Sequence, residues 1–293
     1  MPFAKRSVNI DVYGRGPWKE AWTTFKKNRT ALLGLALFIL LILVAIFAEQ
    51  IAPYGHDDQN LARRFRPPGK EFIFGTDNFG RDIFSRIVLG SRYSLVIGAV
   101  AMTVSAFLGT VLGAIAGFYS DVIDNAIMRF MDLLMAIPNM MLAISIIAVL
   151  GNGVQNVILA VGISAVPSYA RMIRATVLSI KDQEFIEAAT CLGSSRIRTL
   201  FRHVMPNCIA PIIVQMSLSF SAAILTASAL SFLGLGIMPP TPEWGAMLSN
   251  GRPYIRERPW LVTFPGVAIM IIILALSLIG DGLRDALDPR LKR

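Results

Sequence analysis

Residues 133–170 read LLMAIPNMMLAISIIAVLGNGVQNVILAVGISAVPSYA and contain no charged side chain over 38 positions. A helix of about 20 apolar residues crosses the hydrocarbon core of a membrane, so this stretch is too long for one crossing. Gly151-Asn152-Gly153 and the nearby Gln155-Asn156 interrupt it with a polar turn signal. The stretch therefore predicts two membrane helices joined by a short turn.

The same apolar pattern extends over the whole chain of 293 residues, of which 54% are hydrophobic and 16% are charged. Soluble proteins carry about 25% charged residues, so this composition indicates a membrane protein. Four further charge-free runs of 18 to 35 residues complete the set. Together they predict an all-α polytopic fold with six transmembrane helices, over about residues 30–51, 93–118, 124–150, 155–178, 208–237 and 259–281.

Lysine and arginine predict how these helices are oriented. Six crossings place both termini on one side, and with the termini in the cytoplasm the inner segments hold 18 cations and the outer segments 10. The first apolar run is followed by Glu49-Gln50 and not by a small-residue cleavage site, so we expect a retained helix. The predicted division is a cytoplasmic arm (1–29), a first helix (30–51), an outer loop (52–92), a core (93–284) and a cytoplasmic tail (285–293).

Several functional classes lack the residues they need. The only Gly-Lys pair, Gly69-Lys70, is followed by Glu71, so the chain has no phosphate-binding loop of the G-x-x-x-x-G-K-[ST] type. The two histidines, His56 and His203, are predicted on opposite sides of the membrane, where they cannot share a zinc ion. We expect no catalytic residue, no metal site and no cofactor in this chain.

The distribution of charge favours a pathway whose energy comes from a partner. Charged residues gather at the ends of the predicted helices, whereas a proton-coupled carrier keeps ionisable residues inside the bilayer. The net charge of +9 is explained by helix orientation and by contact with anionic membrane lipid, without nucleic acid. A passive pore is compatible with these residues, and a membrane-embedded enzyme would need a convergent catalytic set that the sequence does not contain.

A charged insert, residues 184–207 (EFIEAATCLGSSRIRTLFRHVMPN), separates two apolar runs. Its first part predicts an amphipathic helix with Phe185, Ala189 and Leu192 on one stripe. Gly193 can adopt the left-handed conformation that ends a helix, and Ser194 or Ser195 can cap the next one. The second helix carries an apolar face made of Ile197, Leu200, Phe201 and Val204. Either an interfacial helix on lipid headgroups or a docking surface fits this pattern.

The same insert resembles a family signature. Glu187-Ala188-Ala189, Gly193 four positions later and Pro206 at the end match the motif EAA-x3-G-x9-I-x-L-P of ATP-binding-cassette importer permeases. His203 and Met205 replace the isoleucine and the leucine of the motif. The resemblance implies that the loop over residues 180–207 is a coupling helix that docks into a cytoplasmic ATPase, with the coupling residues Glu184, Glu187, Ala188, Ala189 and Gly193.

Three further motifs resemble the second permease of dipeptide, oligopeptide, glutathione and nickel uptake systems. They are FGTDNFGRDIFSRIVLGSRYSL (74–95), SFLGLGIMPPTPEWGAML (231–248) and GDGLRDALDPRLKR (280–293). The likeness implies a type I importer fold in a bacterial inner membrane, with a homologous permease, two ATP-binding subunits that hold ATP and Mg²⁺, and an extracytoplasmic substrate-binding protein as partners. It implies short peptides as cargo, with glutathione, a nickel chelate or another small solute as alternatives.

Polar side chains on the fifth predicted helix form a stripe. Four serines fall within about 80° of one another at 100° per residue: Ser217, Ser221, Ser228 and Ser231. Small residues of this kind pack helices closely in membranes. Alternatively, their hydroxyl groups line a wet path for a peptide.

In the outer loop, Asp77, Arg81, Asp82 and Arg86 predict an ordered turn that leads into a helix and is stabilised by ion pairs. This turn either closes the outer mouth by itself or contacts the substrate-binding protein. Pro138 and Pro167 lie within the third and fourth predicted helices, where each removes a backbone donor and favours a kink. Such a kink either fixes the helix shape or serves as a hinge.

Overall fold

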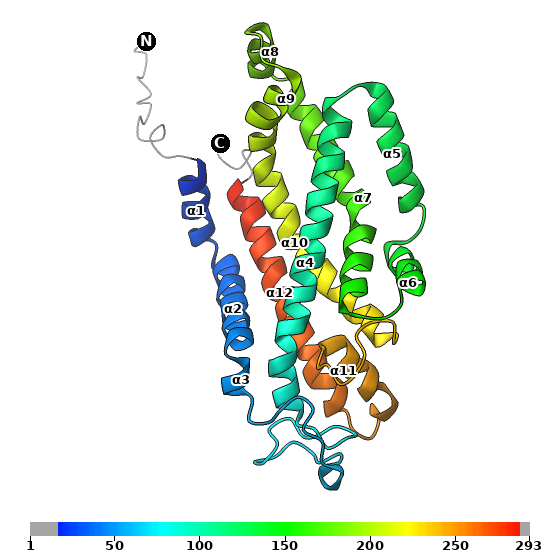
Figure 1. Cartoon of the computed structure of the whole chain (residues 1–293). Helices are drawn as coiled ribbons and strands as arrows, with labels where there is room; N and C mark the ends of the chain where they lie inside the picture. The colour runs from blue at the N-terminus through cyan, green and yellow to red at the C-terminus, as the bar shows by residue number, and fades with distance from the viewer. Residues whose placement is uncertain (1–16, 288–293) are drawn as a thin grey trace, which may run out of the picture.

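The computed structural model describes residues 17–287, and within this range every named element is a helix. Five helices are long and apolar enough to cross a membrane: α2 (Arg29–Ile46), α4 (Ile83–Phe118), α7 (Val154–Lys181), α10 (Met205–Phe232) and α12 (Trp260–Leu287). A bent pair, α5 (Asp121–Met135) and α6 (Asn139–Leu150), supplies the sixth crossing if it is counted as one span. The prediction of an all-α polytopic fold is confirmed (Figure 1).

The predicted helix over 124–150 is divided in two, at the proline where the sequence predicts a kink. The chain bends by 88° between α5 and α6, and Pro138 lies at the break. Proline has no N–H to donate and keeps the preceding residue, here Ile137, out of the helical conformation, which explains why the break falls at this point. Pro167, in contrast, lies inside α7, which continues without interruption to Lys181.

Two other boundaries differ from those predicted from charge. α4 begins at Ile83, ten positions before the expected start, because Asp82 caps its first turn through the backbone N–H of Ser85. α12 continues to Leu287, beyond the expected helix end at 281, so Asp285 of the predicted tail lies on this helix. The remaining part of the predicted tail, 288–293, and residues 1–16 of the predicted arm lie outside the described residues.

α4 is the central helix, and it packs closely because of its glycines. Gly109, Gly113 and Gly117 follow one another every four residues and face α7, where an added Cβ would lie 2.3 Å from Tyr169 Cβ, 2.4 Å from the Ala170 carbonyl oxygen and 2.9 Å from the Arg174 carbonyl oxygen. Small residues at this spacing let two membrane helices approach to backbone contact. The closely packed α4–α7 pair therefore lies at the centre of the bundle, and other helices pack against it.

The shorter elements gather at the two ends of the bundle (Figure 1). One end holds α1 (Pro17–Lys27), α8 (Glu184–Cys191), α9 (Arg196–Thr199) and η3 (Leu200–Val204), next to the end of α12. The other end holds α3 (Ala48–Ile51), η2 (Leu61–Arg63), the loop before α4, α11 (Trp244–Gly251) and η4 (Arg252–Tyr254). The first end contains the predicted coupling loop, and the second contains the predicted outer loop.

Candidate functional site

The predicted helix, turn and helix of the coupling loop are all present. α8 ends at Cys191, and Gly193 follows with φ of +83°, a left-handed conformation that glycine adopts without strain. The backbone N–H of Ser194 donates to the Ala189 carbonyl over 3.1 Å. Ser195 then caps α9 by accepting from the backbone N–H of Arg198. No atom lies within 4 Å of a Cβ added to Gly193, so glycine is needed there for its conformation and not for space.

Only a few side chains anchor this loop to the bundle. Ile186, Leu200 and Val204 are buried and pack against Ile173, Val177 and Ile180 of α7. Gln183 links the elements, since its N–H donates to the Ile180 carbonyl and its carbonyl accepts from the Ile186 N–H. The loop is therefore joined firmly to α7 on one side and, through η3, to α10 on the other.

The rest of the loop faces outward. Glu184, Glu187, Ala188 and Gly193 are exposed, and Ala189 is half-buried. The apolar stripe predicted on α8 does not turn toward the bundle, since Leu192 is 90% exposed and Phe185 is 41% exposed. Two carboxylates and an uncovered apolar face thus lie together, as expected of a surface that another chain covers.

The four serines of α10 divide into two groups. Ser221, Ser228 and Ser231 are buried, and Ser217 is half-buried with its hydroxyl donating to the Val214 carbonyl. The outer two lie in close contact with glycines: a Cβ on Gly245 of α11 would lie 2.4 Å from the Ser228 carbonyl oxygen, and a Cβ on Gly236 would lie 2.6 Å from Ser231 Cβ. Ser217 is therefore the member most open to a pathway, and the other three lie inside this chain.

The hydroxyls of Ser228 and Ser231 face the carboxylate of Glu243, which is 1% exposed and caps α11 by accepting from the N–H groups of Gly245 and Ala246. Burial raises the pKa of this carboxyl group, and the two backbone N–H groups partly offset that shift. The outer end of α10 thus places two buried hydroxyl groups beside the buried carboxylate that caps α11.

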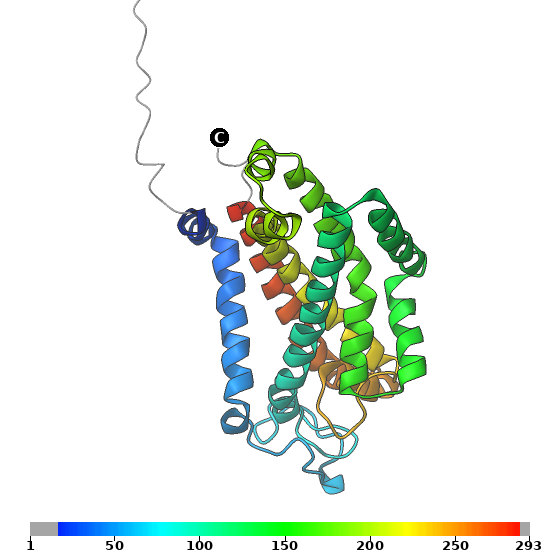
Figure 2. The ribbon, with the colours of Figure 1, turned by 45° about the horizontal axis from the view of Figure 1, so that its top comes forward.

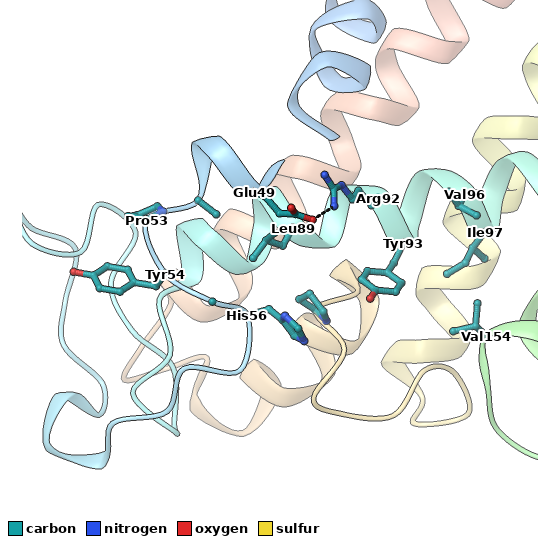
Figure 3. A pocket seen from close by; sticks show the side chains of 13 residues that line it. Glu49, Pro53, Tyr54, His56, Leu89, Arg92, Tyr93, Val96, Ile97 and Val154 are labelled. Atoms are coloured by element: carbon teal, nitrogen blue, oxygen red, sulfur yellow. Dashed lines mark hydrogen bonds and ion pairs between the residues drawn. The ribbon is translucent and has the colours of Figure 1, made fainter. Parts of the chain in front are cut away.

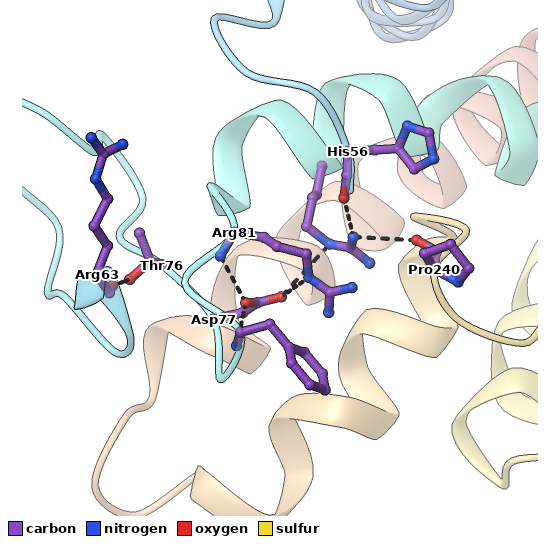
Figure 4. A network of polar contacts seen from close by, with 8 residues as sticks. His56, Arg63, Thr76, Asp77, Arg81 and Pro240 are labelled. Atoms are coloured by element: carbon purple, nitrogen blue, oxygen red, sulfur yellow. Dashed lines mark hydrogen bonds and ion pairs between the residues drawn. The ribbon is translucent and has the colours of Figure 1, made fainter. Parts of the chain in front are cut away.

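The ionic turn in the predicted outer loop is also buried (Figure 4). Arg81 donates from Nε to Asp77 over 2.7 Å, and Arg86 donates to the carbonyls of His56 and Pro240. Asp82 pairs with no arginine of residues 17–287 and instead caps α4, where it accepts from the Ser85 N–H and hydroxyl. Arg81, Asp82 and Arg86 are each at most 4% exposed. These residues join the outer loop to α4 and to the turn before α11, and their contact with a binding protein stays a prediction.

A cavity of about 710 Å³, here called the outer vestibule, opens beside this turn. Its lining includes Glu49, His56, Arg92, Tyr93 and Val154, which come from α3, the following loop, α4 and the start of α7 (Figure 3). Arg92 bridges Glu49 and the last carbonyls of α2, those of Ala45 and Ile46. Sequence reasoning did not find this cavity, because its walls are more than 100 residues apart in the chain.

One exposed face of α4 runs from the outer vestibule to the coupling loop. Its members recur every three or four residues and are apolar or carry a hydroxyl: Tyr93, Val96, Val100, Thr103, Phe107 and Val111. At its far end the face enters a second cavity, of about 580 Å³, formed with Ile212 and Met216 of α10 and with Ile197 and Phe201 of the coupling loop. An uncovered face of membrane length thus connects the two ends.

No group of three or more His, Cys, Asp or Glu side chains that could hold a metal ion occurs within residues 17–287.

Comparison with known proteins adds to this geometry. Residues 109–293 match the family described as the binding-protein-dependent transport system inner membrane component, and residues 16–68 match the N-terminal TM domain of oligopeptide transport permease C. The dipeptide transport system permease protein DppC of Alkalihalophilus pseudofirmus is 48% identical over 94% of this chain and 91% of the relative.

Two other relatives are similar over nearly the same length. The di/tripeptide transport system permease protein DppC of Pseudomonas aeruginosa is 44% identical over 94% of this chain and 93% of its own. The glutathione transport system permease protein GsiD of Escherichia coli is 45% identical over 95% and 92%. Among solved structures, the MetNI methionine ABC transporter in inward-facing conformations shares the fold, with a TM-score of 0.55 and 18% identity over 69% of this chain and 96% of that chain.

Proposed function

We propose that this chain, which belongs to the family of binding-protein-dependent transport system inner membrane components, is one of two permease subunits of an ATP-driven importer of short peptides. The observation that carries the proposal is the exposed face of α4, which joins the outer vestibule to the coupling loop. In the single chain this face is uncovered. A second, homologous permease is the partner that would cover it and enclose a pathway between the two subunits. In this arrangement the termini and the coupling loop lie in the cytoplasm of a bacterial cell.

The coupling loop would connect this pathway to ATP hydrolysis. Two partner subunits bind and hydrolyse ATP with Mg²⁺, and one of them grips the exposed side of α8 around Glu187, Ala188 and Gly193. Because α8 is two residues from α7 and packs on it through Ile186, a displacement of α8 moves α7 as well. α7 in turn contacts α4 at Gly109, Gly113 and Gly117, and η3 transmits the same displacement to α10. Closure of the ATPase pair would thus reopen the permease pair outward.

Delivery takes place at the opposite end. The outer vestibule is where a substrate-binding protein would release its cargo, above the turn built by Asp77, Arg81, Asp82 and Arg86. Within the pathway, weak and generic contacts suit an importer, since tight binding would slow release. The hydroxyls of Thr103 and Ser217 can exchange hydrogen bonds with a peptide's amide groups while the apolar side chains tolerate different residues.

Relatives named for dipeptide and di/tripeptide transport favour short peptides as cargo, and a relative named for glutathione transport favours that tripeptide as the second candidate. The test is uptake into proteoliposomes that contain this chain, its partner permease, both ATPases and the binding protein. Labelled dipeptide should accumulate only with ATP, and unlabelled dipeptide should compete better than glutathione.

If only glutathione accumulates, the cargo is glutathione and not dipeptides, while the proposal of ATP-driven import still holds. Equal equilibration of either solute without ATP, by this chain reconstituted alone, would contradict the importer and identify a passive pore.

A further inference from the structure

The short helix α1 sits at the end of the bundle that carries the coupling loop and runs at a steep angle to α2 (Figure 2). One side of it is fixed to the bundle. Ala21 and Phe25 are buried in a cluster with Ala286 of α12, and Gly282 leaves room for the Phe25 ring and for Ala31 of α2. Asn28, between α1 and α2, accepts from the N–H groups of Thr30 and Ala31 and donates to Asp285 of α12.

A second side of α1 is uncovered and aromatic. Trp18 is 54% exposed and Trp22 is 51% exposed, one helical turn apart. Trp22 stacks on the buried ring of Phe25 with 5.8 Å between the ring centroids. This contact orients the exposed indole ring of Trp22.

Lysines border this aromatic side. Lys26 lies over the Trp22 ring with Nζ 5.1 Å from the centroid, and Lys19 falls next to it on the helix. Lys19, Lys26 and Lys27 are all exposed. The arrangement places two indole rings beside a cluster of ammonium groups, which is the composition of helices that lie in a membrane interface.

We propose that α1 binds anionic phospholipid in the leaflet on the side of the coupling loop, with the Trp18 and Trp22 rings at headgroup level and the lysines on the phosphates. The connection to α2 supports this placement, since α2 enters the membrane at Arg29, two residues after α1 ends. Tryptophan concentrates at this depth, and lysine near the surface attracts acidic lipid. The inference needs only a membrane-spanning α2 and does not depend on the transport function.

Lipid held in this way would give the bundle a fixed point. α1 contacts α12 through Phe25 and continues into α2, so a bound headgroup holds the ends of both helices at one depth. The coupling loop lies at the same end but belongs to α7 and α10 (Figure 1). In this arrangement α2 and α12 would be anchored by lipid, whereas α7 and α10 would move with the coupling loop.

The test uses the full chain in phosphatidylcholine bilayers that contain a fixed fraction of phosphatidylglycerol. Either lipid carries bromine high in its acyl chains, which quenches nearby indole fluorescence. A Trp18→Phe, Trp22→Phe variant identifies the part of the signal that comes from α1. Brominated phosphatidylglycerol should quench that part more strongly than the same fraction of brominated phosphatidylcholine.

Replacing Lys19, Lys26 and Lys27 together by glutamine should weaken this lipid preference about fivefold for each lysine that contacts a headgroup. The matched control replaces Arg196, Arg198 and Arg202 of the coupling loop by glutamine, which removes the same charge at the same end and should leave the preference intact. An unchanged preference in the lysine variant would overturn the proposal. So would α1 fluorescence that is quenched by aqueous acrylamide and protected only when partner subunits assemble, because α1 would then be a protein-binding surface.

Discussion

The two ends of the bundle use charged residues in opposite ways. At the outer end, Arg81, Asp82 and Arg86 are buried, and each is bonded to a carboxylate, a hydroxyl or a carbonyl of this same chain. At the other end, Glu184 and Glu187 face outward beside exposed apolar side chains. These charged groups of the outer loop thus find their partners within this chain. The coupling loop is anchored by few side chains, and its other side chains are exposed to solvent or to a partner protein. Substitutions at the outer end should therefore change stability, and substitutions on the coupling loop should change function.

The largest loss of stability should come from Arg86→Ala. This change leaves the His56 and Pro240 carbonyls without a buried donor and takes one of two cations from Asp77. Removing one partner of a buried charged group costs about 3 kcal/mol or more. Thermal unfolding in detergent measures the effect. Arg66→Ala is the control, because its pair with Glu71 is about half exposed and such pairs contribute about 1 kcal/mol or less.

A smaller loss is expected for Gly90→Ala. A Cβ at this position would lie 1.8 Å from the Pro242 carbonyl oxygen, so α4 and the turn before α11 must separate. Overpacking of this kind costs about 1–3 kcal/mol. The same addition in the coupling loop, Gly193→Ala, meets no atom and should cost only about 1 kcal/mol for its left-handed backbone. Equal unfolding temperatures for the two variants would contradict the close contact at Gly90.

Glu187→Arg should have almost no effect on stability, because exposed substitutions usually change the free energy of unfolding by less than about 0.5 kcal/mol. Its effect on function should be complete, since it reverses the charge that the ATPase meets. ATP-dependent uptake in proteoliposomes measures this, with Lys70→Glu in the outer loop as a charge-reversal control. Normal uptake by Glu187→Arg would show that this residue is not part of the surface that contacts the ATPase.

Sequence patterns predicted the parts of this molecule that depend on short stretches. Apolar runs placed the crossings, and the order of Gly193 and Ser195 predicted the turn and the cap of the coupling loop. The α4–α7 contact was within reach of the same reasoning, because Gly109, Gly113 and Gly117 repeat every four residues.

Other features depend on contacts between distant residues. Charge alone places the start of α4 too late, because Arg86 and Arg92 are typical of a loop in the sequence, whereas in the structure backbone carbonyls from other segments accept their hydrogen bonds. The outer vestibule likewise joins α3 to α7. The helix α1 falls within the predicted cytoplasmic arm, although the spacing of Ala21 and Phe25 already favours a helix with one buried face.

The most direct test of the account is the amount of ATPase that co-purifies with this chain, expressed with its partner subunits, when Gly193 is changed to valine or to asparagine. Asparagine tolerates the left-handed backbone at the end of a helix and valine does not, while the Cβ that both variants add has no atom within 4 Å. The account predicts that the ATPase is retained by Gly193→Asn and lost from Gly193→Val, with both variants folded in the membrane. Retention of the ATPase by the folded valine variant would contradict the claim that this loop is where the ATPase docks.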